Sequence, residues 1–214
     1  MAWTGSSPTA GSAAESANAV ALRGDSRRLL FHVSLLTSLG LVSALAATFA
    51  KLRLGIPGHS AVLWLVPIVL GRCLVPQRAA GTMASTSAAL AMFCLRGFSL
   101  RWPLVATFGS FWLVGPALDL YVATIARFVL RSREHGRWPV GLRGAAFAAL
   151  AGVAGNYAHL ALKLLFGAMR PHAPRFGLAS GLYEMVTYLV FGLAAGLVAY
   201  AVARPFLRAE THDA

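Results

Sequence analysis

The sequence predicts an all-α fold, a polytopic membrane protein built as a bundle of six transmembrane helices. Hydrophobic residues make up 57% of its 214 residues and charged residues only 12%, which is far from the composition of an ordinary soluble domain. Apolar runs of roughly 20 residues, the length that crosses a hydrocarbon core, recur along the chain. The 19 Lys and Arg residues stand mostly in the gaps between these runs, as the charges of membrane-protein loops do.

The formal net charge of +12 does not indicate a nucleic-acid partner. Proteins that bind nucleic acid carry Lys and Arg on one accessible face or tail, whereas here the charges flank apolar runs. We therefore expect a lipid bilayer as the partner of most of the surface, and no nucleic acid. Cys73 and Cys94 form neither a disulfide framework nor a metal pattern, so two free thiols are expected.

The N-terminal 28 residues are rich in Ala, Ser and Gly and end in Arg23, Arg27 and Arg28. They predict a flexible cytoplasmic tail, followed by a six-helix domain over residues 29–204 and a short cytoplasmic tail over 205–214. A signal peptide would bring its positive charges first and its apolar core within the opening residues, whereas here no apolar run is expected before residue 29. The first span is expected over residues 29–50, ended by the Gly-Ile-Pro-Gly sequence at 55–58, because Pro and Gly interrupt helices.

The second span is expected over residues 58–75 and the third over 79–95. The third is built from small residues, including Gly81, Ser85, Ala88 and Ala89, which allow neighbouring backbones to approach closely. We therefore expect it at the centre of the bundle.

The fourth span covers residues 102–129 and is interrupted by Gly115 and Pro116, where a kink is expected. Asp119 follows this point, and Arg72 and Arg127 are its possible partners, which favours a structural role for the carboxylate. The fifth span covers residues 142–168. The sixth covers 182–203 and is expected to end at Pro205.

Positive charges set the predicted orientation. With the N-terminus inside, twelve Lys and Arg residues fall on the cytoplasmic side and six on the outer side, and Lys163 lies within a span. The two-to-one bias favours both termini in the cytoplasm of a multi-pass protein in the cell (inner) membrane.

The fifth span carries unusual polar groups for an apolar helix. Asn156, His159 and Lys163 are spaced three and four residues apart, so one helix face presents all three, and Gly152 and Gly155 continue it. An ionisable group at membrane depth costs a few kcal/mol unless it faces protein or water, and such groups mark binding sites or pathways. This stripe is therefore expected to face protein.

Polar and aromatic residues at the outer ends of the second and sixth spans complete a predicted pocket. It is outward-facing, with aromatic walls and both charge signs, and suits a small, partly polar ligand. The predicted substrate-binding residues are His59, Trp64, His159, Lys163, Tyr183, Glu184 and Tyr188, and Asp119 and Asn156 are expected to be structural.

Structural readings of the same residues stay open. Lys163 and Glu184 could form a structural ion pair, or the Lys163 amine could reach the headgroups. His159 could be a helix-to-helix hydrogen-bond donor. His59 follows a Pro-Gly turn and could cap the second span.

The sequence lacks the patterns of a membrane enzyme. It has no paired carboxylates, no Ser with a Lys or His base and no helical array of metal ligands, and no phosphate-binding loop or dinucleotide fingerprint. His59, His159 and His172 offer no pair of ligands four residues apart, which disfavours a metal or haem site. We expect no enzyme, no cofactor and no metal, and any energy would come from a partner or a gradient.

Three segments carry a resemblance to a known family. They are residues 54–59 (Leu-Gly-Ile-Pro-Gly-His), 115–120 (Gly-Pro-Ala-Leu-Asp-Leu) and 191–197 (Phe-Gly-Leu-Ala-Ala-Gly-Leu). With six spans in about 180 residues and both ends inside, the chain resembles the S components, the substrate-binding membrane subunits of energy-coupling-factor transporters. The resemblance implies a vitamin-like ligand and docking onto a coupling transmembrane subunit that carries two ATPases.

In that family, docking is associated with an Ala-x-x-x-Ala pattern in the first helix, whose spacing Ala46 and Ala50 match. No binding residue is carried over from the resemblance. The expected function is therefore the capture of a small molecule for uptake. The alternatives are a helical membrane protein with a scaffolding or assembly role and a membrane enzyme that acts on a lipid.

Overall fold

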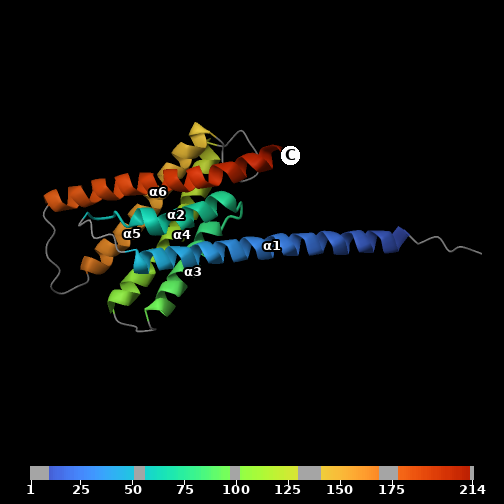
Figure 1. The fold of residues 1–214 in the computed structure, drawn as a ribbon, viewed down its shortest axis with the longest axis horizontal. Coiled ribbons are helices and arrows are strands. Elements are labelled where there is room, and N and C mark those ends of the chain that lie inside the picture. Colours follow the sequence, from blue (N-terminus) through green and yellow to red (C-terminus); the bar gives the residue numbers. More distant parts are fainter. Residues whose placement is uncertain (1–9, 51–55, 97–101, 130–140, 169–177, 213–214) are drawn as a thin grey trace, which may run out of the picture. The chain divides into compact units, whose positions relative to one another are not determined.

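The secondary structure of the described residues is entirely α-helical (Figure 1). The computed structural model describes residues 10–50, 56–96, 102–129, 141–168 and 178–212. Its helices are α1 (Ala10–Phe49), α2 (Ala61–Leu74), α3 (Ala80–Leu95), α4 (Trp102–Val129), α5 (Leu142–Ala168) and α6 (Leu178–His212). The all-α prediction is therefore confirmed for the part of the chain that is described.

The chain divides into two compact units, Met1–Leu35 and Leu36–Ala214. In the first unit, residues 10–35 belong to α1, so much of the segment expected as a flexible tail is helical. Leu29, Leu30 and Phe31 are exposed there. The second unit holds the rest of α1 and the other five helices.

Within the described residues, four segments are long and apolar enough to cross a membrane: Ser26–Phe49, Phe108–Ile125, Leu142–Leu165 and Gly181–Ala209. The helices α2 and α3 have 14 and 16 residues. At about 1.5 Å per residue they extend only about 21 and 24 Å, short of the roughly 30 Å of a hydrocarbon core. The four long helices are those of a membrane protein. Of the six predicted spans, four correspond to helices that are long enough to cross a membrane, and α2 and α3 are shorter.

Large apolar side chains remain exposed along the long helices, as expected of surfaces that face lipid. They include Leu41 and Val42 on α1, and Met185, Val186, Leu197 and Val198 on α6. The buried side of α6 carries Ala195, Ala199 and Ala203 together with Tyr188 and Tyr200, so this helix is largely apolar on both sides.

The predicted end of the last helix at Pro205 is wrong, because α6 continues through Pro205 to His212. Pro removes one backbone hydrogen bond and strains a helix, but Ala203 and Leu207 on either side of it are buried. Packing therefore holds the helix together across the proline. Pro67 in α2 and Pro116 in α4 also lie inside helices.

Small residues bring α5 and α6 into backbone contact. A Cβ atom added at Gly152 would collide with the carbonyl oxygen of Gly192, and one at Gly196 would collide with that of Ala148. Gly192 and Gly196 therefore lie directly against the fifth helix, where van der Waals contact between backbones stabilises the pair.

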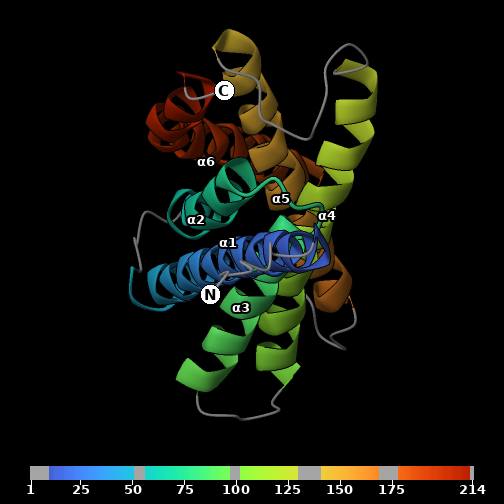
Figure 2. The same ribbon diagram turned by 90° about the vertical axis from the view of Figure 1, so that its right-hand side faces the viewer.

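Helix α3 packs closely against its neighbours, as its small residues predict. A Cβ atom at Gly115 of α4 would collide with Gly81 and Ser85, and one at Gly40 of α1 would lie 2.5 Å from the Ala84 carbonyl oxygen. Figure 2 shows α3 and α4 running side by side. Gly155 of α5 faces core side chains of α2 and α4, so the stripe on α5 faces protein.

Candidate functional site

The imidazole of His159 lies among aromatic rings from three other helices. Its ring centroid is 5.0 Å from that of Trp64 on α2, 5.7 Å from that of Phe111 on α4 and 6.4 Å from that of Tyr188 on α6, with which it is stacked at 18°. Trp64 and Phe111 are 4.6 Å apart. We call these four residues the imidazole cluster, and it joins α2, α4, α5 and α6.

Local structure fixes the orientation of each ring. Trp64 lies in the first turn of α2, where its carbonyl oxygen accepts a 2.6 Å hydrogen bond from Ser43 Oγ of α1. Phe111 lies one helical turn before Gly115, the point at which α4 touches α3. Trp64, Phe111 and Tyr188 are all nearly fully buried, so their rings have little room to reorient.

Asn156 lies one turn before His159 and ties α5 to α6. Its Nδ2 donates a 2.8 Å hydrogen bond to the Tyr188 carbonyl oxygen, and the residue is completely buried. The expected helix-joining role of Asn156 is therefore visible in its Nδ2 group. Its Oδ1 atom, however, is buried without a hydrogen-bond partner among the described residues.

His159 also has one satisfied and one unsatisfied polar atom. The ring forms a hydrogen bond with the backbone of Ser110 on α4. Its Nδ1 atom is buried and has no partner among the described residues, so the bond to Ser110 uses Nε2. Asn156 Oδ1 and His159 Nδ1 are thus two buried, unsatisfied groups on one face of α5.

Lys163 is exposed at the end of the same stripe. Its Nζ atom lies 3.4 Å from the Tyr188 hydroxyl and 5.8 Å from the centroid of the Tyr188 ring. Lys163 and Glu184 both lie in the described part of the chain, and no ion pair joins them. The structural ion pair considered for these two residues is therefore not formed.

The turn before α2 covers Tyr188. Gly58 has φ +77°, a conformation that favours glycine, and a Cβ atom built there would lie 3.0 Å from the Tyr188 ring. His59 follows, with Nδ1 bonded to the Ile56 carbonyl oxygen and its ring 6.4 Å from that of Phe191 on α6. Ser60, and not His59, occupies the N-cap position of α2.

Among the described residues, two predicted site residues form no hydrogen bond, ion pair or ring contact with the imidazole cluster. Tyr183 is 53% exposed, and Glu184 is half-buried. Tyr183 precedes Tyr188 by five residues, which places it roughly 140° around the helix. The structure thus gathers Trp64, His159, Lys163 and Tyr188, with His59 beside them in the turn.

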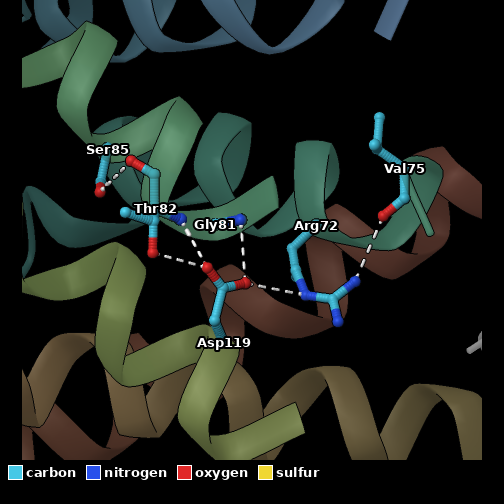
Figure 3. A network of polar contacts seen from close by, with 6 residues as sticks. All are labelled: Arg72, Val75, Gly81, Thr82, Ser85 and Asp119. Carbon is cyan, nitrogen blue, oxygen red and sulfur yellow. Dashed lines mark hydrogen bonds and ion pairs between the residues drawn. The ribbon is translucent and has the colours of Figure 1, made fainter. Parts of the chain in front are cut away.

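A second polar cluster surrounds Asp119 on α4 (Figure 3). Its carboxylate accepts hydrogen bonds from the backbone N–H of Gly81 at 3.0 Å and of Thr82 at 2.7 Å, and from the Thr82 hydroxyl at 2.7 Å. Arg72 Nε lies 3.1 Å from Asp119 Oδ1, and Arg72 Nη1 donates to the Val75 carbonyl oxygen at 3.2 Å.

This cluster neutralises two helix ends. Asp119 caps the first turn of α3, whose N–H groups have no partners within the helix, and its negative charge suits that end of the helix dipole. Arg72, in the last turn of α2, satisfies a carbonyl group there. Of the two partners considered for Asp119, Arg72 forms the ion pair, and the side chain of Arg127 lies outside the described part of the chain. The contacts are those of a structural site.

Sequence reasoning missed Phe111 and the capping of α3 by Asp119. Phe111 belongs to a buried stripe at helical spacing with Val114, Leu118 and Val122. That periodicity identifies the buried face of α4, though not the imidazole as its neighbour. The capping of α3 by a residue 37 positions away carries no local signal.

Among the described residues, no group of three or more His, Cys, Asp or Glu side chains could hold a metal ion. His172 lies outside the described residues. Cys73 is buried and Cys94 is exposed, and both are free thiols, as expected.

Comparison with protein-family models, curated proteins and solved structures found no match for this chain. Its function must therefore be argued from the imidazole cluster and its surroundings.

Proposed function

We propose that this protein binds a small molecule at the imidazole cluster. The observation that carries the proposal is the pair of unsatisfied buried groups on α5, Asn156 Oδ1 and His159 Nδ1. A buried polar atom without a hydrogen bond costs about 1–3 kcal/mol, and native structures retain few of them. Two on one helix face, walled by aromatic rings, have the character of a ligand site.

The proposed setting is the cell membrane, with both termini in the cytoplasm. Most residues of α2 are buried against other helices, and α3 is enclosed by small-residue contacts. We propose that these two helices complete a six-helix bundle as short, protein-covered spans beside the four long ones. The exposed Lys163 at the end of the α5 stripe then lies toward the outer face.

The proposed role is the capture of the ligand for uptake, as the substrate-binding subunit of a transporter. The sequence contains no phosphate-binding loop, so energy would come from a coupling transmembrane subunit and its ATPases. The likeness of residues 54–59 and 191–197 to the S components of energy-coupling-factor transporters supports this role. The binding site itself does not depend on that partner.

Identification of the bound molecule tests the proposal. The full chain and its His159→Phe variant are purified from membranes in detergent, and the small molecules released on denaturation are compared by mass spectrometry. Tyr183→Phe is the matched control, because Tyr183 is an exposed aromatic residue of α6 outside the cluster. One compound should be released from the wild type and from Tyr183→Phe, but not from His159→Phe.

A scaffolding role is the second candidate, and the Asp119 cluster favours it. Asp119 and Arg72 join three helices through contacts that serve only structure, as do the glycine contacts of α5 and α6. The scaffolding role is supported if no compound is released from any variant and His159→Phe retains full cellular function.

A further inference from the structure

We infer that the ligand is a flat aromatic molecule that presents N–H donors to Asn156 Oδ1 and His159 Nδ1 and carries an anionic group near Lys163. This inference rests on the proposed function and specifies the class of ligand. It follows from three properties of the described residues: which polar atoms remain unsatisfied, what surrounds them, and which charge lies at the end of the stripe.

Both unsatisfied atoms are hydrogen-bond acceptors. The Asn156 amide nitrogen is committed to the Tyr188 carbonyl, which identifies the remaining atom as the oxygen, and an amide oxygen only accepts. His159 bonds the backbone of Ser110. With the ring proton on the nitrogen that donates to that backbone, Nδ1 keeps a lone pair and accepts. The ligand must therefore supply donors.

The spacing of the acceptors sets the arrangement of the donors. Asn156 and His159 are three residues apart on α5, so their Cβ atoms lie about 5–6 Å from each other on one helix face. A single small ring with two N–H groups spans that distance. A ligand with donors at opposite ends of a long chain does not fit this pair.

The walls favour a flat aromatic molecule. Trp64, Phe111 and Tyr188 surround the imidazole with centroid distances between 5.0 and 6.4 Å, and rings of this kind stabilise another ring by offset or edge contacts. A hydrated ion would lose its water against these walls without enough ligands to replace it.

The positive charge of Lys163 determines the sign of the charge that we expect on the ligand. Its amine lies 3.4 Å from the Tyr188 hydroxyl, and Glu184 on the neighbouring helix does not pair with it. A cationic ligand stacked on Tyr188 would be repelled by this amine, whereas a carboxylate or phosphate would be attracted. The anionic end of the ligand therefore lies toward Lys163 and the donor ring toward His159.

Three probes of equal charge and similar shape test the donor requirement. Benzimidazol-2-one-5-carboxylate has two N–H donors, indole-5-carboxylate has one and benzofuran-5-carboxylate has none. Their affinities for the detergent-purified full chain are measured by equilibrium dialysis. Affinity should fall in that order, with about a tenfold loss for each missing donor, because a buried acceptor left without its partner is costly.

Variants assign the effect to its residues. His159→Phe keeps the ring and removes the acceptor, so it should weaken the two-donor probe about tenfold and leave benzofuran-5-carboxylate unchanged. Asn156→Leu should act similarly, and gel filtration verifies that each variant is folded. Lys163→Met should abolish the preference for indole-5-carboxylate over indole, while Tyr183→Phe should change nothing.

Equal affinity for the three probes, or no binding of any of them, would overturn the inference. The proposed function has a separate readout, the natural compound released from the wild type and lost from His159→Phe. If that compound lacks N–H donors or an anionic group, the ligand class is wrong and the binding function stands. If no compound is released and no probe binds, both are wrong.

Discussion

Removal of the Asp119 carboxylate should be among the most destabilising single substitutions in the protein. The side chains of Arg72 and Asp119 are only 5% and 13% exposed, so solvent does not screen their interaction. Asp119→Ala leaves the Arg72 charge buried without its counterion, which typically costs 3–5 kcal/mol, taken as about 4 here. It also removes the cap of α3, for about 1 kcal/mol more.

The expected loss in the free energy of unfolding is therefore about 5 kcal/mol. Arg72→Ala should cost less than Asp119→Ala, because the carboxylate keeps its three hydrogen bonds to Gly81 and Thr82. In the double variant, neither charge is left alone. Its destabilisation should fall short of the sum of the two single effects by at least about 1 kcal/mol.

The assay is unfolding of the purified chain by sodium dodecyl sulfate in mixed micelles, followed by far-ultraviolet circular dichroism. Arg78→Ala is the control, because Arg78 is exposed in the turn that follows α2 and its loss should change stability by less than about 0.5 kcal/mol. A coupling below about 0.5 kcal/mol between Arg72 and Asp119 would refute the reasoning. So would an Asp119→Ala variant as stable as the control.

Three further outcomes are expected. Gly196→Ala should lower stability by about 1–3 kcal/mol, because its Cβ atom would collide with the backbone of α5. Gly181→Ala is the control and should be tolerated, because nothing lies within 4 Å of a Cβ atom there. Equal melting temperatures of the two variants would contradict the close packing of α5 and α6. His159→Phe should change the melting temperature of the chain without ligand by less than the equivalent of about 1 kcal/mol, since it removes an unsatisfied buried group and also the hydrogen bond to Ser110; a loss of more than about 3 kcal/mol would contradict this balance. N-ethylmaleimide should add one label to the native protein, at exposed Cys94 and not at buried Cys73. Intact-mass measurement counts the labels, and two labels on the native protein would contradict the burial of Cys73.

The helices that the sequence located best are those bounded by clear interruptions. The predicted ranges of α4 and α5 agree with Trp102–Val129 and Leu142–Ala168, because charged and glycine-containing loops separate these apolar runs. The start of α1 and the end of α6 were missed, since helix formation there continues past polar residues and Pro205. Such ends depend on packing as well as on local propensity.

The candidate site was predictable where its geometry is local to one helix. The spacing of Asn156, His159 and Lys163 fixes their common face whatever surrounds it, and the structure places that face against protein. Tyr183 and Phe111 show the limit. Which residue of a neighbouring helix meets the imidazole depends on the rotation and depth of that helix, and a single sequence does not encode these in any local pattern.

The amount of small molecule carried per chain is the most direct test of the binding site. The wild type and Tyr183→Phe, purified in parallel, should each release the same compound in an amount approaching one per chain, and His159→Phe should release almost none. Equal amounts from all three proteins would contradict binding at the imidazole cluster, and so would the absence of any compound from the wild type.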